Sequence, residues 1–204
     1  MVLGSNESLL RGINFAALVG EGVDQNSLER SIHALEEVGA TVRLVSMRRG
    51  ALRGPGREQS ANGLQVHLSF DEADPLEFSG ALVPAGERHA EVLRKNPAVR
   101  EFIIEIADAA KPIAACAEGI VLLLDTGLLQ DRAVAAPEKF KGSLAQAGAK
   151  WSEKNVEADG LLVTAASTAS SDELIQTLLE VTANHVKQHV KGTLDEKASI
   201  GPSS

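Results

Sequence analysis

The residues with the greatest chemical potential lie in the segment KPIAACAEGI, residues 111–120, which contains the single cysteine of the chain. The apolar run before Cys116 predicts a buried strand, and a turn into a helix is expected directly after it. A cysteine on such a turn acts as a nucleophile when a helix N-terminus or a cation lowers its thiol pKa. A cysteine that points into the core is instead a small apolar residue. The direction of the thiol therefore decides whether this segment carries covalent chemistry.

Acidic side chains supply a second kind of chemistry near the same segment. Glu21 and Asp24 follow an apolar strand over residues 13–19, and Glu118 follows the strand that begins near Pro112. The carboxyl ends of parallel strands meet at one edge of a sheet, so these three carboxylates are expected to lie near one another. They could serve acid–base catalysis or a hard metal ion. We expect them instead to be solvated loop acids, with Glu118 favoured by the helix dipole.

The histidines give weaker signals. His89 lies just past Gly86, where it could border a pocket at the same edge. His185 and His189, four residues apart on a predicted helix, could hold a transition metal on one face, but no third ligand is spaced with them. We expect these two to be surface or interface residues, and we predict no metal and no cofactor.

The elements that position these residues alternate between strand and helix. Residues 13–19 and 41–46 predict strands, and the helix between them carries Leu28, Ile32 and Leu35 at helical spacing. Further strands are expected in GALVPAG, in the segment before Cys116 and in ADGLLVTA. This order predicts an α/β fold with a mainly parallel central sheet covered by helices on both faces.

Length and composition limit the remaining possibilities. The chain has 204 residues, a net charge of −8 and 3% aromatic residues, which opposes nucleic-acid binding. No segment approaches the roughly 20 apolar residues of a membrane span, and a lone cysteine cannot form an internal disulfide, so we expect a cytoplasmic protein. We expect a flexible arm over residues 1–11, one domain over 12–190 and a disordered tail over 191–204, where the sequence lacks an apolar period.

Three blocks of the chain resemble, in order and spacing, the PfpI superfamily, which is related to the class I glutamine amidotransferases. The blocks are LVGEGVDQNSLERSIHALEEVGATVRLVS, GALVPAGERHAEVLRKNPAVREFIIEIADAAKPIAACAEGIVLL and LAQAGAKWSEKNVEADGLLVTA. The resemblance covers about residues 12–190. It implies a flavodoxin-like three-layer sandwich.

Active members of this family share a stretch of the type Ala-Ile-Cys-His-Gly, whose reactive cysteine lies on a strained strand-to-helix elbow. Matching Gly119 to the family glycine puts Ala117 on the elbow and Glu118 at the histidine position. Cys116 falls one residue early, and the alternation of side chains along a strand turns its thiol toward the core. The resemblance therefore predicts that Cys116 is a packing residue.

The supporting positions of the family site have changed as well. Asp24 stands where the family has a glutamate that hydrogen-bonds the thiol, and Ala85 with Gly86 replaces a glycine pair that helps to hold an oxyanion. We predict no catalytic residue from this pattern. The degenerate site consists of Asp24, Gly86, Cys116, Ala117 and Glu118.

These changes most resemble the C-terminal domain of large-subunit catalases, which keeps the fold without the reactive site. The resemblance implies a non-enzymatic domain for stability, oligomer assembly or chaperone-like protection under oxidative stress, with a second copy or a linked catalase core as its partner. The chain has no tyrosine, the haem ligand of catalases, so it is not the catalase itself. The alternative is a hydrolase, deglycase, glyoxalase or protease of the PfpI family that uses Cys116 or the carboxylates.

Overall fold

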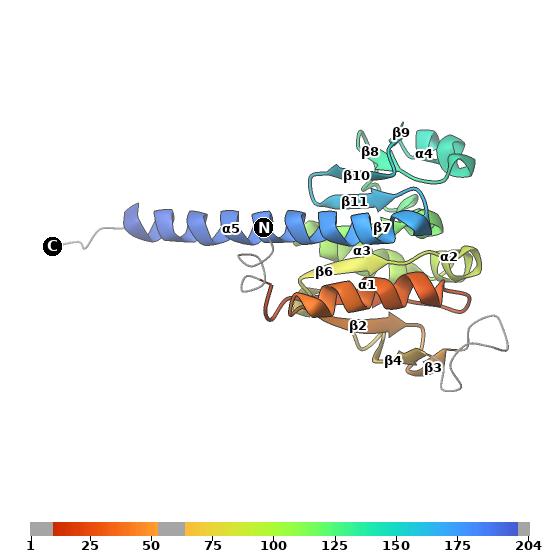
Figure 1. Cartoon of the computed structure of the whole chain (residues 1–204), viewed down its shortest axis with the longest axis horizontal. Helices are drawn as coiled ribbons and strands as arrows, with labels where there is room; N and C mark the ends of the chain where they lie inside the picture. The colour runs from red at the N-terminus through yellow and green to blue at the C-terminus, as the bar shows by residue number, and fades with distance from the viewer. Residues whose placement is uncertain (1–9, 53–63, 200–204) are drawn as a thin grey trace.

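The computed structural model describes residues 10–52 and 64–199, with side chains described through residue 188. Its centre is a seven-stranded sheet in the order β10-β11-β7-β6-β1-β2-β5 (Figure 1). All neighbouring pairs in this sheet are parallel except β10 with β11. The prediction of a mainly parallel central sheet is confirmed.

The strands of the main sheet are short. They are β1 (Asn14–Leu18), β2 (Thr41–Ser46), β5 (Leu68–Ser69), β6 (Gly80–Val83), β7 (Ile113–Cys116), β10 (Val156–Asp159) and β11 (Leu162–Ala165). Two small sheets flank it, one formed by β3 (Gly50–Leu52) with β4 (Leu64–Val66) and one by β8 (Ala133–Ala135) with β9 (Lys150–Ser152).

The α-helices are α1 (Gln25–Glu37), α2 (Glu87–Arg94), α3 (Pro97–Asp108), α4 (Lys141–Gln146) and α5 (Ser171–Ser199). Short 3-10 helices lie at η2 (Pro75–Glu77), η3 (Ala117–Leu123), η4 (Glu138–Phe140) and η5 (Thr168–Ser170). The helix η3 starts directly at the end of β7, where the sequence predicts a turn from strand to helix.

Two apolar clusters fill the space above and below the sheet. One packs α1 and α5 against one face, and the other packs α2, α3 and η3 against the opposite face (Figure 1). Alternation along each strand assigns its side chains to the two clusters: in β7, Ile113 and Ala115 face α3, whereas Ala114 and Cys116 face α1 and α5. The three-layer flavodoxin-like sandwich is confirmed.

The helix α5 runs farther than the sequence suggested. It continues through Ser199, so residues 191–199 of the expected disordered tail are helical, while residues 200–204 and 1–9 lie outside the described residues. The segment TLDEKAS contains the good helix formers Leu, Glu, Lys and Ala, and extending an existing helix avoids the cost of nucleation. Within the described ranges, no helix combines the length and the apolar character that crossing a bilayer requires.

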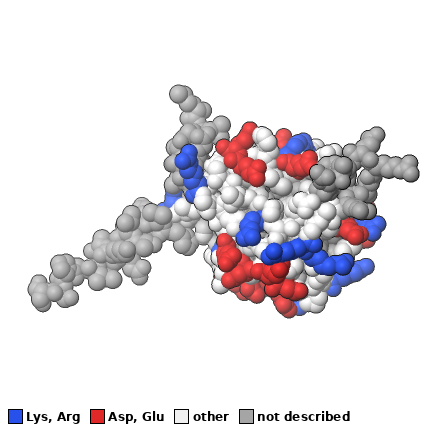
Figure 2. Space-filling view, turned by 90° about the horizontal axis from the view of Figure 1, so that it is seen from below, with Lys and Arg blue, Asp and Glu red and all other residues white. Residues whose placement is uncertain are grey.

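The charged side chains are mixed over the face drawn in Figure 2. Acidic and basic residues form small separate groups there, with uncharged surface between them. That face carries no continuous basic surface of the kind that a phosphate backbone contacts. The absence of a nucleic-acid partner stays a prediction.

The close approach of η3 to the end of β6 yields a stability prediction. A Cβ added at Gly119 would lie 2.7 Å from the backbone oxygens of Val83 and Pro84, so Gly119→Ala forces the two segments apart. We expect it to lower the free energy of unfolding by about 2 kcal/mol in urea titrations.

The matched control is Gly142→Ala in α4, where an added Cβ meets nothing within 4 Å. It should stabilise the protein slightly, because alanine is the better helix former. Equal effects of the two substitutions would show that crowding at Gly119 does not hold the elbow in place.

Candidate functional site

The strand β7 ends in a strained turn at Ala117. This residue has a φ of 48°, in the left-handed region that a non-glycine residue seldom adopts, whereas Cys116 before it is still extended with a φ of −106°. Left-handed backbone costs an L-residue about 1 kcal/mol. The strained elbow of the family is therefore present, and a methyl group occupies it.

The thiol of Cys116 points away from the elbow. Cys116 is 2% exposed and belongs to the apolar cluster under α1 and α5. Its Sγ lies 3.6 Å from the backbone oxygen of Ser167 and 3.8 Å from Oγ of Ser171. The Oγ of Ser171 in turn lies 2.7 Å from Oγ of Ser27. The sulfur is thus held among buried hydroxyls between two helices.

This environment suppresses thiolate formation. Burial raises the pKa of Cys116 from 9.0 to about 11, against a smaller lowering by the Ser171 and Ser27 hydroxyls, and the charges of Glu118 and Asp24 raise it further. The thiol is therefore protonated at neutral pH. Because the thiolate is the nucleophile, Cys116 in this position is unreactive.

Asp24 takes up a structural task. Its carboxylate caps α1 by accepting a hydrogen bond from the Ser27 backbone N–H at 2.9 Å. Its own N–H donates to the backbone oxygen of Ala85 at 2.9 Å, which ties the β1–α1 turn to the β6–α2 turn. Among the described contacts, no hydrogen bond joins Asp24 to Cys116. The carboxylate is one methylene shorter than the family glutamate and is already used by the helix.

Gly86 closes the same edge of the site. Its φ is 135°, and a Cβ there would lie 2.5 Å from the backbone oxygen of Gly22 and 3.0 Å from Cα of Val23. Only glycine fits this contact. The two turns that border the elbow are therefore pressed directly against each other.

Glu118 is the accessible chemical group beside the elbow. Its side chain is 23% exposed, and its Oε1 lies 3.2 Å from Nζ of Lys139, which lies just before α4. The same ammonium lies 3.1 Å from Oε1 of Glu87 at the start of α2. The hydrogen bonds to Glu87 and then to Glu118 raise the pKa of Lys139. Sequence reasoning missed Lys139, because no local pattern connects it to Glu118.

The three carboxylates considered as a possible cluster each take a separate partner. Glu21 pairs with Arg88 on the surface at 3.0 Å, while Asp24 caps α1 and Glu118 contacts Lys139. Such an exposed pair contributes little to stability. Across the described ranges, no group of three or more His, Cys, Asp and Glu side chains could hold a metal ion. The site is instead a single carboxylate and a lysine next to the elbow.

His89 lies in the core beside this edge. It is fully buried on α2, and neither ring nitrogen has a hydrogen-bond partner. A Cβ on Gly20, which precedes the β1–α1 turn, would lie 3.4 Å from its Nδ1. Burial lowers the pKa of His89 from 6.5 to about 4, against a smaller opposing effect of the Pro84 backbone. The imidazole is therefore neutral at physiological pH.

Comparison with known proteins identifies the family. The model of the DJ-1/PfpI family matches residues 15–181. The chain belongs to the DJ-1/PfpI family. The resemblance found in the sequence is therefore confirmed.

Named relatives of this DJ-1/PfpI protein are largely deglycases. Deglycase TK1284 of Thermococcus kodakarensis is 29% identical over 143 residues, which cover 70% of this chain and 83% of the relative. Deglycase PfpI of Pyrococcus furiosus is 29% identical over 128 residues, which cover 63% and 74% of the two chains. Among solved structures, a ThiJ/PfpI domain protein from Brachyspira murdochii superposes with a TM-score of 0.75 at 19% identity, covering 84% of this chain and 96% of that one. This last likeness shows the fold alone.

The expectation of a non-enzymatic domain related to the C-terminal domain of catalases is wrong. Catalase HPII of Pseudomonas putida is 28% identical over 59% of this chain but over only 17% of its own length, whereas the deglycases match over most of theirs. That expectation rested on the absence of a cysteine at position 117 and gave less importance to the elbow backbone, which is preserved. A role in chaperoning or in oxidative stress finds no support among these relatives.

The burial of Cys116 predicts slow alkylation of the native protein. Because its pKa lies near 11, iodoacetamide at pH 7.5 should modify the native thiol at least 100-fold more slowly than the thiol in urea, as followed by mass spectrometry. The control is Cys116→Ser combined with Ala117→Cys, which moves the sulfur onto the elbow. The double variant should react at least tenfold faster than wild type, and equal rates would contradict the thiol direction given above.

The buried imidazole of His89 predicts acid sensitivity. Its pKa near 4 lies below the value of 6.5 in the unfolded chain, so unfolding takes up a proton and stability falls as the pH drops from 6.5 toward 4. At pH 4.5 this cost is about 2 kcal/mol. In urea titrations, the free energy of unfolding of His89→Leu should fall by about 2 kcal/mol less than that of wild type between pH 7.5 and pH 4.5. His33→Gln, which changes an exposed side chain, should behave like wild type, and the same pH dependence in all three proteins would contradict the assignment.

Proposed function

We propose that this protein is an enzyme of the deglycase type, which acts at the elbow on small adducts between a carbonyl compound and an amine. The observation that carries the proposal is the series of deglycase relatives, which match this chain over 74% to 83% of their own length. The preserved elbow at Ala117 and the glycine contact at Gly86 support it, since they keep the backbone of the family site.

Glu118 is the acid–base group of the proposed reaction. It lies next to the elbow and its side chain is 23% exposed, so a substrate bound at the surface beside the elbow can reach its carboxylate. In an aminocarbinol formed from an α-oxoaldehyde, the carbon that bears the hydroxyl also bears an acidic hydrogen beside a carbonyl group. Glu118 removes that proton to give an enediolate and returns it to the former carbonyl carbon, while the proton of the original hydroxyl passes to the former carbonyl oxygen, which yields a 2-hydroxy amide. Water then cleaves the C–N bond to release the amine and a 2-hydroxy acid.

Lys139 supports the same step. Its ammonium holds the Glu118 carboxylate in place at 3.2 Å and supplies a positive charge near the oxyanion that forms when the proton leaves. Glu87 fixes the ammonium from the other side at 3.1 Å. This arrangement requires no thiol, which agrees with the burial of Cys116.

The rival mechanism for this activity uses Cys116 as a nucleophile. It is favoured by one observation, namely that the only thiol of the chain lies directly before the elbow. It requires the side chain to leave its contacts with Ser167 and Ser171 and to lose a proton at a pKa near 11. The acid–base mechanism requires neither change, and we prefer it.

The test is the release of lactate from the adduct of methylglyoxal with N-acetylarginine. We expect wild type to release lactate and Glu118→Gln to lower kcat/KM at least 100-fold, the effect of removing a general base. Cys116→Ser should leave kcat/KM unchanged. Glu91→Gln removes an exposed carboxylate from the outer surface of α2 and serves as the charge-matched control.

Each other outcome is informative. Loss of activity in Cys116→Ser with an unaltered melting temperature, together with full activity in Glu118→Gln, would establish the thiol mechanism. No lactate from wild type would contradict the deglycase proposal itself. We place the enzyme in the cytoplasm and propose that it self-associates, which light scattering of the purified chain can test.

A further inference from the structure

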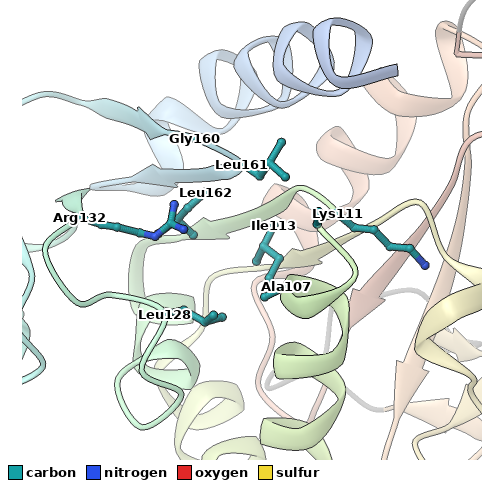
Figure 3. A pocket seen from close by; sticks show the side chains of 9 residues that line it. Ala107, Lys111, Ile113, Leu128, Arg132, Gly160, Leu161 and Leu162 are labelled. Atoms are coloured by element: carbon teal, nitrogen blue, oxygen red, sulfur yellow. The ribbon is translucent and has the colours of Figure 1, made fainter. Parts of the chain in front are cut away.

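A cavity lies at the opposite edge of the sheet from the elbow. It has a volume of about 320 Å³, within the range of small-molecule sites. Its walls are largely apolar: Ala107 lies at the end of α3 and Ala110 in the turn after it, Ile113 begins β7, Leu162 begins β11, and Leu128 closes the other side (Figure 3). Since Ile113 and Cys116 stand at opposite ends of β7, this cavity is separate from the proposed active site.

One guanidinium group reaches into this apolar space. Figure 3 shows the Arg132 side chain extending toward the middle of the lining residues. Its Nη1 donates to the backbone oxygen of Asp159 at 2.8 Å and lies 3.9 Å from Oδ1 of the same residue. No other hydrogen bond joins this guanidinium to the described residues, so its remaining N–H groups are available to a ligand.

The carboxylate of Asp159, which lies beside Arg132, has a hydrogen-bond donor other than that arginine. Oδ2 of Asp159 accepts a hydrogen bond from the backbone N–H of Ala133 at 2.9 Å. A second carboxylate can therefore approach the free side of the guanidinium without leaving Asp159 unpaired. Arginine binds carboxylates through two parallel N–H bonds, which favours a planar anion over a hydrated spherical one.

Lys111 contributes only its aliphatic stem. Its ammonium leads away from the cavity in Figure 3 and donates to the backbone oxygens of Pro75 at 3.2 Å and Leu76 at 2.8 Å. The cavity therefore presents a single cationic group, which fits a ligand with one negative charge.

Backbone strain is concentrated around the same cavity. In the described part of the chain, the non-glycine residues with positive φ are Ala110, Asp131 and the elbow residue Ala117. Ala110, with a φ of 52°, lines the cavity, and Asp131, with a φ of 63°, directly precedes the lining residue Arg132. Such strain is characteristic of functional positions.

We propose that this cavity binds a medium-chain monocarboxylate, with the carboxylate on Arg132 and the hydrocarbon chain along Ala107, Ile113, Leu128 and Leu162. The apolar walls take up a chain that water solvates poorly, and the guanidinium selects the acid over the corresponding alcohol or amine. The site is independent of the deglycase proposal, because it uses neither Glu118 nor the elbow.

The test titrates octanoate, octanol and octylamine into the full-length protein and follows backbone amide shifts by NMR. Octanoate should shift the amides of the cavity residues and bind at least tenfold more tightly than octanol, whereas octylamine should cause no shifts there. Arg132→Gln should weaken octanoate binding at least tenfold. Arg100→Gln, which removes an exposed arginine from the other end of α3, should leave it unchanged.

Two further variants keep the test decisive if Arg132→Gln is unstable. Arg132→Lys keeps the charge but loses the planar fork, and should retain a weakened affinity. Ala107→Met fills the cavity without changing any charge, and should abolish binding while circular dichroism stays that of wild type. No octanoate binding to wild type, shifts confined to the elbow, or equal affinity for octanoate and octanol would overturn the proposal.

Discussion

The first turn of η3 passes so close to the end of β6 that position 119 has room only for a glycine. A Cβ there would lie 2.7 Å from two successive backbone oxygens, at Val83 and Pro84. This approach fixes where η3 begins and therefore where the chain must turn. The strain at Ala117 follows, because the strand has to become a helix within one residue. The contact between Gly86 and the β1–α1 turn then closes the same edge from the side.

Successive side chains of β7 point to opposite faces of the sheet, and this alternation determines which of them lies in the core and which lies at the turn. Cys116 belongs to the face covered by α1 and α5, and the next residue, Ala117, takes the strained turn position while staying buried at 4% exposure. A shift of one position thus exchanges a thiol for a methyl group. The remaining polar group at the turn is Glu118 with its lysine partner. The turn is in this way left with the two groups that the proposed proton transfer uses.

The amino-acid sequence predicts the sheet well, because Leu28, Ile32 and Leu35 mark a helix by spacing alone and alternate strands demand cover on both faces. It also predicts the direction of Cys116. It does not reveal the contact of Lys139 with Glu118, since that pair depends on how η4 folds back over the elbow. The sequence places His89 where it could border a pocket, whereas in the structure it is fully buried, which the charged residues around it in the sequence do not indicate. The prediction of a non-enzymatic domain was wrong because it rested on the missing elbow cysteine. The deglycase relatives, which overturn it, cannot be inferred from that missing residue.

The insulation of Cys116 bears on how this protein withstands oxidants. Peroxide attacks thiolates, and successive steps lead from sulfenic acid to forms that cells do not reduce. An enzyme with an ionised cysteine on its elbow is inactivated by this route. Here the sulfur is 2% exposed and protonated, so peroxide has neither the access nor the charge state that it needs. The position of the sulfur, one residue before the elbow and inside the core, therefore protects it from oxidation.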